Sequence, residues 1–346
     1  MKKEAVILTM LFLITIPVNA MDFTAPAAPP SAQEFMPPET ENFSDGLRYI
    51  IREALDVIQP SFLEASEICI SLIAAALILG LLSEFSGNST PAIKMAGAAS
   101  ACVVLFQPVD SLIRLGTDTV QQISQYGKLL LPVMTGALAA QGAVTKSGAL
   151  YTATAFFDAV LSSTISDLLI PMVYVFLSIA VVCNLVPQPL LVQMRNFLKW
   201  LMTWGLKIVL YIFTGYISIT GVVGGTTDAA MLKATKLTIS GMVPVVGNIL
   251  SDASEAVLVS AGMMKNAAGI YGILAVISIC IRPFIQIGSQ YLMLKLTTGV
   301  TEMFGTKQMA GIIKDFSTAM GLVLAMTGTV CMIFLISMIC FMKGVS

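Results

Sequence analysis

The sequence predicts an all-α, polytopic transmembrane bundle, and three observations lead to that fold class. Of its 346 residues, 56% are hydrophobic and only 11% are charged, whereas soluble domains carry about 25% charged residues. Long apolar runs recur along the chain, several of them approaching the roughly 20 residues that cross a bilayer. Prolines interrupt some of these runs, so we expect kinked or re-entrant helices. Lipid is therefore the expected solvent for most of the chain.

Residues 1–20 have the pattern of a secretory signal peptide. Lys2 and Lys3 are basic, residues 5–16 are apolar, and Ala20 ends a small-residue cleavage site. An uncleaved anchor is the alternative, although the apolar part is short for a span. Residues 21–45 hold five prolines, five acidic residues and no basic residue. We expect this segment to be a disordered tail outside the cytoplasm.

Residues 46–346 form the predicted membrane domain, which opens with an amphipathic helix over residues 46–66. Apolar side chains such as Ile50 fall on one face of this helix, and charged ones such as Arg52 fall on the other. This pattern predicts a helix that lies on the outer membrane surface or docks on a partner.

Apolar runs downstream predict six to eight crossings. The individual runs cover residues 68–82, 93–107, 168–186, 206–223, 270–281, 285–300 and 321–342. The stretch around Arg195 and Lys199 carries no acidic residue and includes Trp200 and Trp204. Positive charge favours the cytoplasmic side and tryptophan the interface. We therefore expect this stretch to be cytoplasmic and the mature N-terminus to lie outside.

A weak tandem repeat relates two candidate units, residues 118–225 and 230–342. Each unit contains two prolines that lie 39 residues apart, Pro132 and Pro171 in the first unit and Pro244 and Pro283 in the second. Each proline of the second unit follows its counterpart in the first by 112 residues. In each unit a basic stretch follows, with the triplets 195–197 and 314–316. Broken helices in repeated units are typical of transporters, where they line a site near the midplane. Simple proline kinks, or chance alignment, are the alternatives.

Four ionisable residues are candidates for a transport pathway or for packing. Asp158 and Arg282 lie in apolar runs, where a charge is costly and often functional, although either could sit at an interface. Asp252 and Glu255 lie about one helical turn apart and could hold a proton or cation. Their spacing also fits a capping box at a helix start, which we favour.

Several classes of activity find no support in the sequence. The chain has no histidine, and its six cysteines form no CxxC pair, so neither a metal site nor a disulfide framework is expected. We also expect the cysteines to pack between helices as small hydrophobes. Nucleotide-binding and nucleophile motifs are missing, which predicts no catalytic residues and no cofactor. The net charge of −1 argues against nucleic acid as a partner.

Residues 216–223, 236–248 and 250–262 are similar to the stage III sporulation protein AE family, which also shares the order of parts over nearly the whole chain. The resemblance implies a protein in the mother-cell membrane around the forespore. It further implies a place in a secretion-like channel needed for late forespore gene expression. Partners would be other stage III A-operon proteins, including a secretion-type ATPase and ring-forming membrane proteins, with a forespore-side protein completing the channel. The resemblance supplies no catalytic residues.

Two function classes follow from these observations. The first is a structural or conducting component of the channel, without enzymatic activity. The second is a self-sufficient secondary transporter, or an export gate, for a small metabolite or ion. Faces rich in small residues imply tight helix packing or a homo-oligomer in either case.

Overall fold

The structure is a computed structural model that describes residues 25–38, 42–85, 90–186, 188–242, 247–304 and 306–343. Over residues 90–91, 219–262 and 264 it describes the backbone alone. Within these ranges all regular structure is helical, which confirms the predicted all-α bundle. The elements, in order, are α2 Pro30–Gln33, α3 Phe43–Phe85, α4 Thr90–Ala140, α5 Val144–Ser163, the π-helical η2 Thr164–Leu169, α6 Ile170–Leu185, α7 Pro189–Met242, α8 Gly247–Phe304 and α9 Lys307–Met342.

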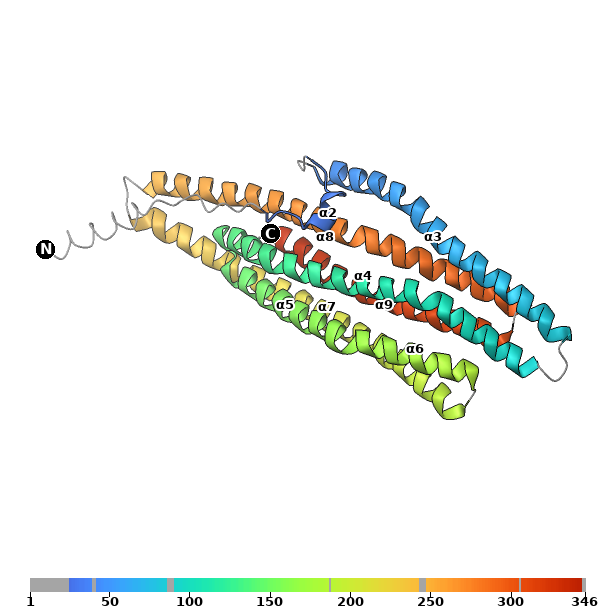
Figure 1. Ribbon diagram of the computed structural model, residues 1–346. Helices are drawn as coiled ribbons and strands as arrows, with labels where there is room; N and C mark the ends of the chain where they lie inside the picture. The colour runs from blue at the N-terminus through green and yellow to red at the C-terminus, as the bar shows by residue number, and fades with distance from the viewer. Residues whose placement is uncertain are drawn as a thin grey trace.

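The helices run side by side along one axis, and α9 lies at their centre (Figure 1). It contacts α4, α5, α6, α7 and α8, and about half of its residues are buried. Helices α3, α6 and α8 end, and α4, α7 and α9 begin, at the same end of the bundle, which we call the turn end. The last turns of α7 and the first turns of α8 lie at the opposite end, beyond the last residues of α9.

Small residues set the closest helix contacts. A Cβ atom added at Gly272 in α8 would lie 2.6 Å from Leu130 Cδ2 in α4, and one added at Gly127 in α4 would meet the ring of Phe334 in α9. These glycines therefore allow the helices to approach more closely than alanine would permit. The predicted cysteine packing is also observed, because the six thiols are free and lie fully or partly buried.

In the part of the chain that the structure describes, six helical stretches are long and apolar enough to cross a membrane, by length and composition, which falls within the predicted range. They cover Phe43–Phe85, Ala92–Ala140, Val144–Leu185, Pro189–Ser218, Lys265–Phe304 and Lys307–Met342. The separate spans predicted at 270–281 and 285–300 are wrong, because α8 continues through Pro283. A proline removes one backbone hydrogen bond, and the packing of α8 against α3, α4 and α9 keeps the helix continuous.

The predicted amphipathic helix over residues 46–66 is the first half of α3 and not a separate surface element. Ile50 and Ala54 are buried, and the Ser289 hydroxyl of α8 donates a hydrogen bond of 3.5 Å to the Ser61 carbonyl. The apolar face therefore packs on α8. Part of that face, including Leu55, remains exposed.

Residues 25–38 differ from the disordered tail that their composition predicts. Ala32 and Phe35 are completely buried, and the Ala28 amide donates a hydrogen bond of 3.2 Å to the Tyr271 hydroxyl. A single aromatic residue and a few alanines thus hold this segment against α8, an effect that average composition does not reveal. The predicted signal peptide and the rest of the tail up to residue 24 lie outside the described residues.

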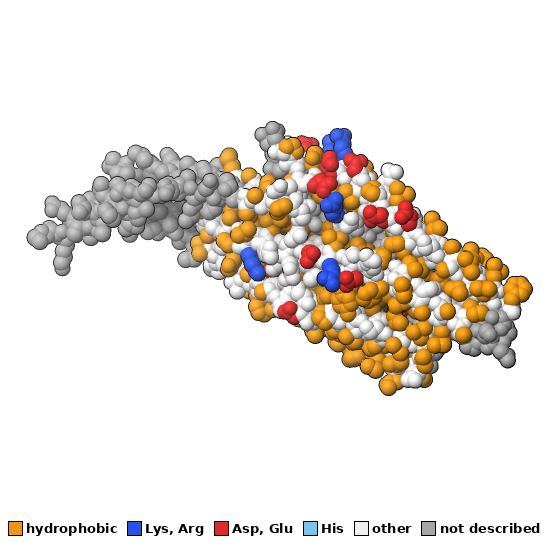
Figure 2. All heavy atoms as spheres, in the orientation of Figure 1, with side chains coloured by type: hydrophobic (Ala, Val, Ile, Leu, Met, Phe, Trp, Pro, Cys, Tyr) orange, Lys and Arg blue, Asp and Glu red, His pale blue; other side chains and the backbone are white. Residues whose placement is uncertain are grey.

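The surface is unusually apolar towards the turn end. On the face in Figure 2, hydrophobic side chains cover the half of the molecule near the α3–α4 and α6–α7 turns, and charged side chains gather nearer the middle. The exposed residues there include Ile70, Leu81, Val103, Phe106, Val182 and Tyr211. Soluble monomers rarely expose apolar patches of this extent, so the surface fits contact with lipid.

Candidate functional site

A buried polar cluster surrounds Asp158 in the middle of α5. Asp158 is 3% exposed, and its Oδ2 accepts a hydrogen bond of 2.8 Å from the Ser124 hydroxyl of α4. The other carboxyl oxygen, Oδ1, is buried and has no hydrogen-bond partner within the described part of the chain. Asp158 therefore lies inside the bundle, and its part in a pathway or in packing stays a prediction.

One turn before Asp158, a second polar contact joins α5 to α9. The Thr154 hydroxyl of α5 donates a hydrogen bond of 2.7 Å to the Ser337 hydroxyl of α9, and both side chains are fully buried. Buried polar groups are costly unless they are paired. The cluster thus joins α4, α5 and α9 by hydrogen bonds in an otherwise apolar core.

Arg282 occupies an exposed position on α8, away from the protein interior. Its guanidinium Nη2 lies 3.5 Å from Glu34 Oε2 of the N-terminal segment, and both side chains are about half exposed. Such a pair contributes little to stability. Arg282 is therefore a surface residue of the bundle that pairs with Glu34 and not with Asp158, and its place relative to the membrane stays a prediction.

Asp252 and Glu255 both lie within α8, which begins at Gly247. The predicted capping box is therefore wrong, because Asp252 follows the helix start by five residues instead of preceding it. Because both residues lie in one helix, three positions apart, they are separated by about one helical turn on the same side of α8. The surroundings of their side chains lie outside the described part of the structure.

The prolines of the candidate repeat have different settings. Pro132 and Pro283 lie inside the continuous helices α4 and α8, and Pro171 lies in the first turn of α6, directly after the π-helical segment η2. Pro244 falls outside the described residues. A continuous helix at Pro132 favours a kink over a re-entrant break. The tandem duplication itself stays a prediction. The pairs α3–α4, α6–α7 and α8–α9 are all antiparallel at the turn end, so the shared arrangement does not single out the two candidate units.

A further charged site was missed by sequence reasoning. The Arg195 Nη1 atom of α7 lies 2.9 Å from Asp315 Oδ2 of α9. The same carboxylate oxygen accepts a hydrogen bond of 2.9 Å from the side-chain amide of Asn184 in α6. The two charged side chains are 23% and 9% exposed. Both belong to the basic triplets of the candidate repeat, which was the available signal. Their pairing across 120 positions was not readable from the sequence.

Potential metal ligands do not gather in the described residues, where no group of three or more Cys, Asp or Glu side chains could hold an ion. The polar features found are a buried carboxylate and an inter-helix ion pair. Their geometry suits the packing of helices in a membrane or the passage of a charge between them.

Helices of this length, an apolar exterior and isolated buried polar contacts define a multi-pass helical membrane protein. The model of the stage III sporulation protein AE family matches residues 33–344, and the chain belongs to that family. The resemblance seen in the sequence is thereby confirmed, and the chain has a role in sporulation.

A curated relative is the stage III sporulation protein AE of Bacillus subtilis (strain 168). It is 24% identical to this chain over 265 residues, which cover 76% of this chain and 66% of the relative. The chain thus spans just under two thirds of that relative's length. Both names denote sporulation proteins, and neither denotes an enzyme. No solved structure matches the chain.

Proposed function

We propose that this protein is an integral membrane component of a channel complex between the mother cell and the forespore, located in the mother-cell membrane around the forespore. The length of its helices carries the proposal. Helices α3, α4 and α8 contain 43, 51 and 58 residues, which correspond to about 65, 77 and 87 Å. The hydrocarbon core measures only about 30 Å. Much of the bundle is therefore available outside the bilayer for contact with partners.

The charge distribution supports an orientation with the turn end in the cytoplasm. Among the described residues, six basic ones lie within about three turns of this end, together with three acidic ones. The basic residues are Lys94, Arg195, Lys199, Lys295, Lys307 and Lys314, and the acidic ones are Glu84, Glu302 and Asp315. Positive residues near helix ends favour the cytoplasmic side. The opposite end, where α7 ends and α8 begins, then projects into the space between the two membranes, and α3 begins about midway along the bundle on the same side (Figure 1).

The proposed partners are other stage III A-operon proteins. A secretion-type ATPase would act at the cytoplasmic turn end, whereas ring-forming membrane proteins and a forespore-side protein would meet the projecting end. Family membership supports association with sporulation proteins. Exposed apolar residues on the projecting half, such as Leu55 and Phe156, offer contact area for such partners.

Site-specific photo-crosslinking in sporulating cells tests this proposal. A photoreactive residue at Ser44, exposed where α3 begins, should crosslink to ring-forming partners. The same residue at Gln188, exposed in the α6–α7 turn, should crosslink instead to cytoplasmic components. If neither position gave an adduct with another stage III A-operon protein, the assembly role would be contradicted.

A second candidate function, an export gate or transporter for a small ion or metabolite, is favoured by the Asp158 cluster. A buried carboxyl with an unpartnered oxygen is a common feature of proton and ion pathways. The test is ion flux into vesicles that contain the purified chain, with Asp158→Asn compared with Asp167→Asn, an exposed carboxylate on η2. Flux lost only in Asp158→Asn supports transport, and equal flux in both variants contradicts it.

A further inference from the structure

A charged groove runs between α7, α8 and α9 close to the turn end. Two adjoining cavities of 580 and 530 Å³ form it, and Lys199, Glu302 and Lys314 line both. All three helices supply its basic side chains, which are Arg195, Lys199, Lys295, Lys307 and Lys314. We call this feature the cationic groove.

The cationic groove contains fewer acidic than basic side chains, so its net charge is positive. Its two carboxylates are already engaged, Asp315 with Arg195 at 2.9 Å and Glu302 with Lys314 at 3.8 Å. Lys199, Lys295 and Lys307 form no ion pair within the described ranges. Lys295 donates a hydrogen bond of 3.1 Å to the Tyr291 hydroxyl, which is a neutral partner. The groove therefore has five basic side chains and two carboxylates, an excess of three positive charges.

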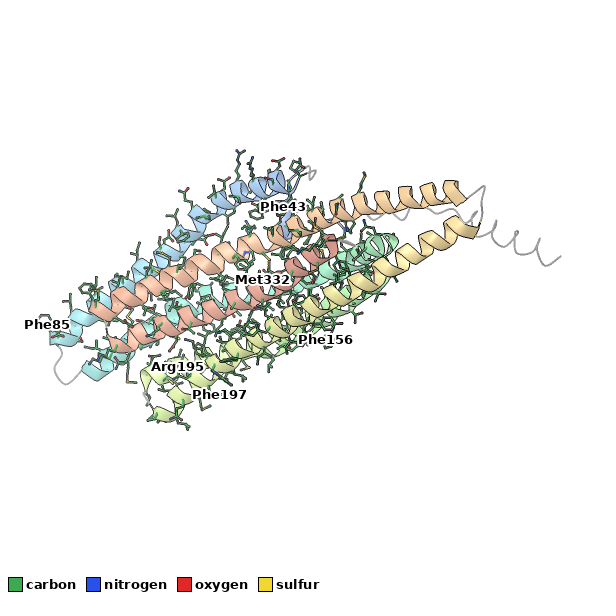
Figure 3. All side chains as sticks on the ribbon, turned by 180° about the vertical axis from the view of Figure 1, so that it is seen from behind. Phe43, Phe85, Phe156, Arg195, Phe197 and Met332 are labelled. Atoms are coloured by element: carbon green, nitrogen blue, oxygen red, sulfur yellow. The ribbon has the colours of Figure 1, made fainter. Side chains whose placement is uncertain are left out.

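The surroundings of the cationic groove are apolar and aromatic. Figure 3 shows Arg195 and Phe197 on the first part of α7, with Arg195 on the side of its partner helix α9. Phe197, Trp200 and Trp204 are all about half exposed, and their rings follow one another at centroid distances of 6.0 and 6.4 Å. Exposed tryptophans of this kind mark the headgroup level of a bilayer. The groove thus lies at the headgroup level marked by the exposed aromatic side chains on the outer face of α7.

The ligand chemistry follows from these two properties together. Uncompensated ammonium groups beside a lipid-facing surface are costly unless an anion accompanies them. Basic pockets between transmembrane helices bind the phosphates of anionic lipids. We propose that the cationic groove binds the phosphate of an acidic phospholipid, whose acyl chains cover the neighbouring apolar faces of α7 and α8. The inference requires that the chain lies in a membrane, and it is independent of the proposed channel partners.

The two tryptophans of the chain, Trp200 and Trp204, provide a probe because both are exposed on α7 at the level of Lys199, which lines the groove. The full chain is reconstituted in phosphatidylcholine vesicles that contain either brominated phosphatidylglycerol or brominated phosphatidylcholine. Bromine quenches tryptophan fluorescence only at short range, so the ratio of quenching reports which lipid occupies the groove. We expect the acidic lipid to be preferred at least fivefold, and inorganic phosphate at matched ionic strength not to reverse that preference.

Paired variants separate charge from fold. Lys199→Gln with Lys295→Gln should abolish the preference for the acidic lipid, since one basic residue near an anionic surface contributes roughly fivefold, whereas Lys199→Arg with Lys295→Arg should retain it. Arg48→Gln with Arg52→Gln, on the first half of α3, serves as the control and should behave as wild type.

Several results would overturn the inference. One is equal quenching by both lipids in the wild type, and another is an undiminished preference in the glutamine pair. Reversal by inorganic phosphate would identify a site for free phosphate instead. Displacement of the lipid by a glutamate-rich peptide would identify a protein-binding groove.

Discussion

Among individual residues, Arg195 and Asp315 form the most buried ion pair in the described part of the molecule, and it joins α7 to α9 close to the turn end. The Asn184 amide completes the coordination of the Asp315 carboxylate from α6. The consecutive helices α6 and α7 thus meet the distant helix α9 at one carboxylate. The role of this contact is to fix their relative positions, since a buried pair contributes more to geometry than to net stability.

Replacing one partner of this pair should destabilise the fold strongly. Arg195→Met leaves the Asp315 carboxylate buried without its cation, which costs about 3–5 kcal/mol. The Tm of the purified protein in detergent should fall accordingly. Adding Asp315→Leu should recover most of the loss, because the uncompensated charge is then removed.

Arg114→Met is the matched control, because Arg114 pairs with Asp110 but is 74% exposed. Exposed pairs contribute little, so the Tm of this variant should match that of the wild type. An equal loss of Tm in Arg195→Met and Arg114→Met would show that burial of the Arg195–Asp315 pair has no special importance.

At the scale of helices, the sequence predicted where helical spans occur better than where each helix begins and ends. Apolar runs located all the candidate spans, because lipid exposure and core burial both select hydrophobic residues. The break expected at Pro283 does not occur, since contacts of α8 with three neighbours outweigh one missing hydrogen bond. For the same reason the helix predicted to end at residue 66 continues to Phe85.

The candidate site was predicted only in part. Asp158 was recognised because an acidic residue in an apolar run is conspicuous. Its partner Ser124 and the Thr154–Ser337 contact were not, because hydroxyl residues are common in membrane helices and give no local signal. Arg282 was equally conspicuous and proved to be a surface residue, since sequence alone does not show which face of α8 points outward.

The contact between α4 and α9 depends on the absence of a side chain at Gly127. Gly127→Ala should lower stability by about 1–3 kcal/mol, because the new methyl group meets the buried ring of Phe334. Gly148→Ala in α5 is the control, since a Cβ there has no neighbour within 4 Å. Helix propensity should make that change neutral or stabilising by up to about 1 kcal/mol.

Thermal unfolding in detergent measures both glycine variants. Adding Phe334→Leu to Gly127→Ala should restore part of the lost Tm by making room for the methyl group. A wild-type Tm in Gly127→Ala would show that α4 and α9 are not held at the separation described.

For the molecule as a whole, the account predicts one orientation in the membrane. Cysteines introduced at Gln188, just before α7, and at Ser44, at the start of α3, should react differently in intact vegetative cells that produce the protein, after the six native cysteines have been replaced. In the proposed orientation, with the turn end in the cytoplasm, a membrane-impermeant maleimide should label Ser44→Cys and spare Gln188→Cys. The reverse pattern would invert the proposed orientation.

The central claim is that the protein acts in sporulation as a component of a larger membrane channel. The most direct test is solute and ion flux through vesicles that contain the purified protein, measured with and without the other stage III A-operon proteins. The account predicts tight vesicles with this protein alone and conductance only when its partners are present. Selective flux through the protein alone, abolished by Asp158→Asn, would contradict it and establish a transporter in its own right.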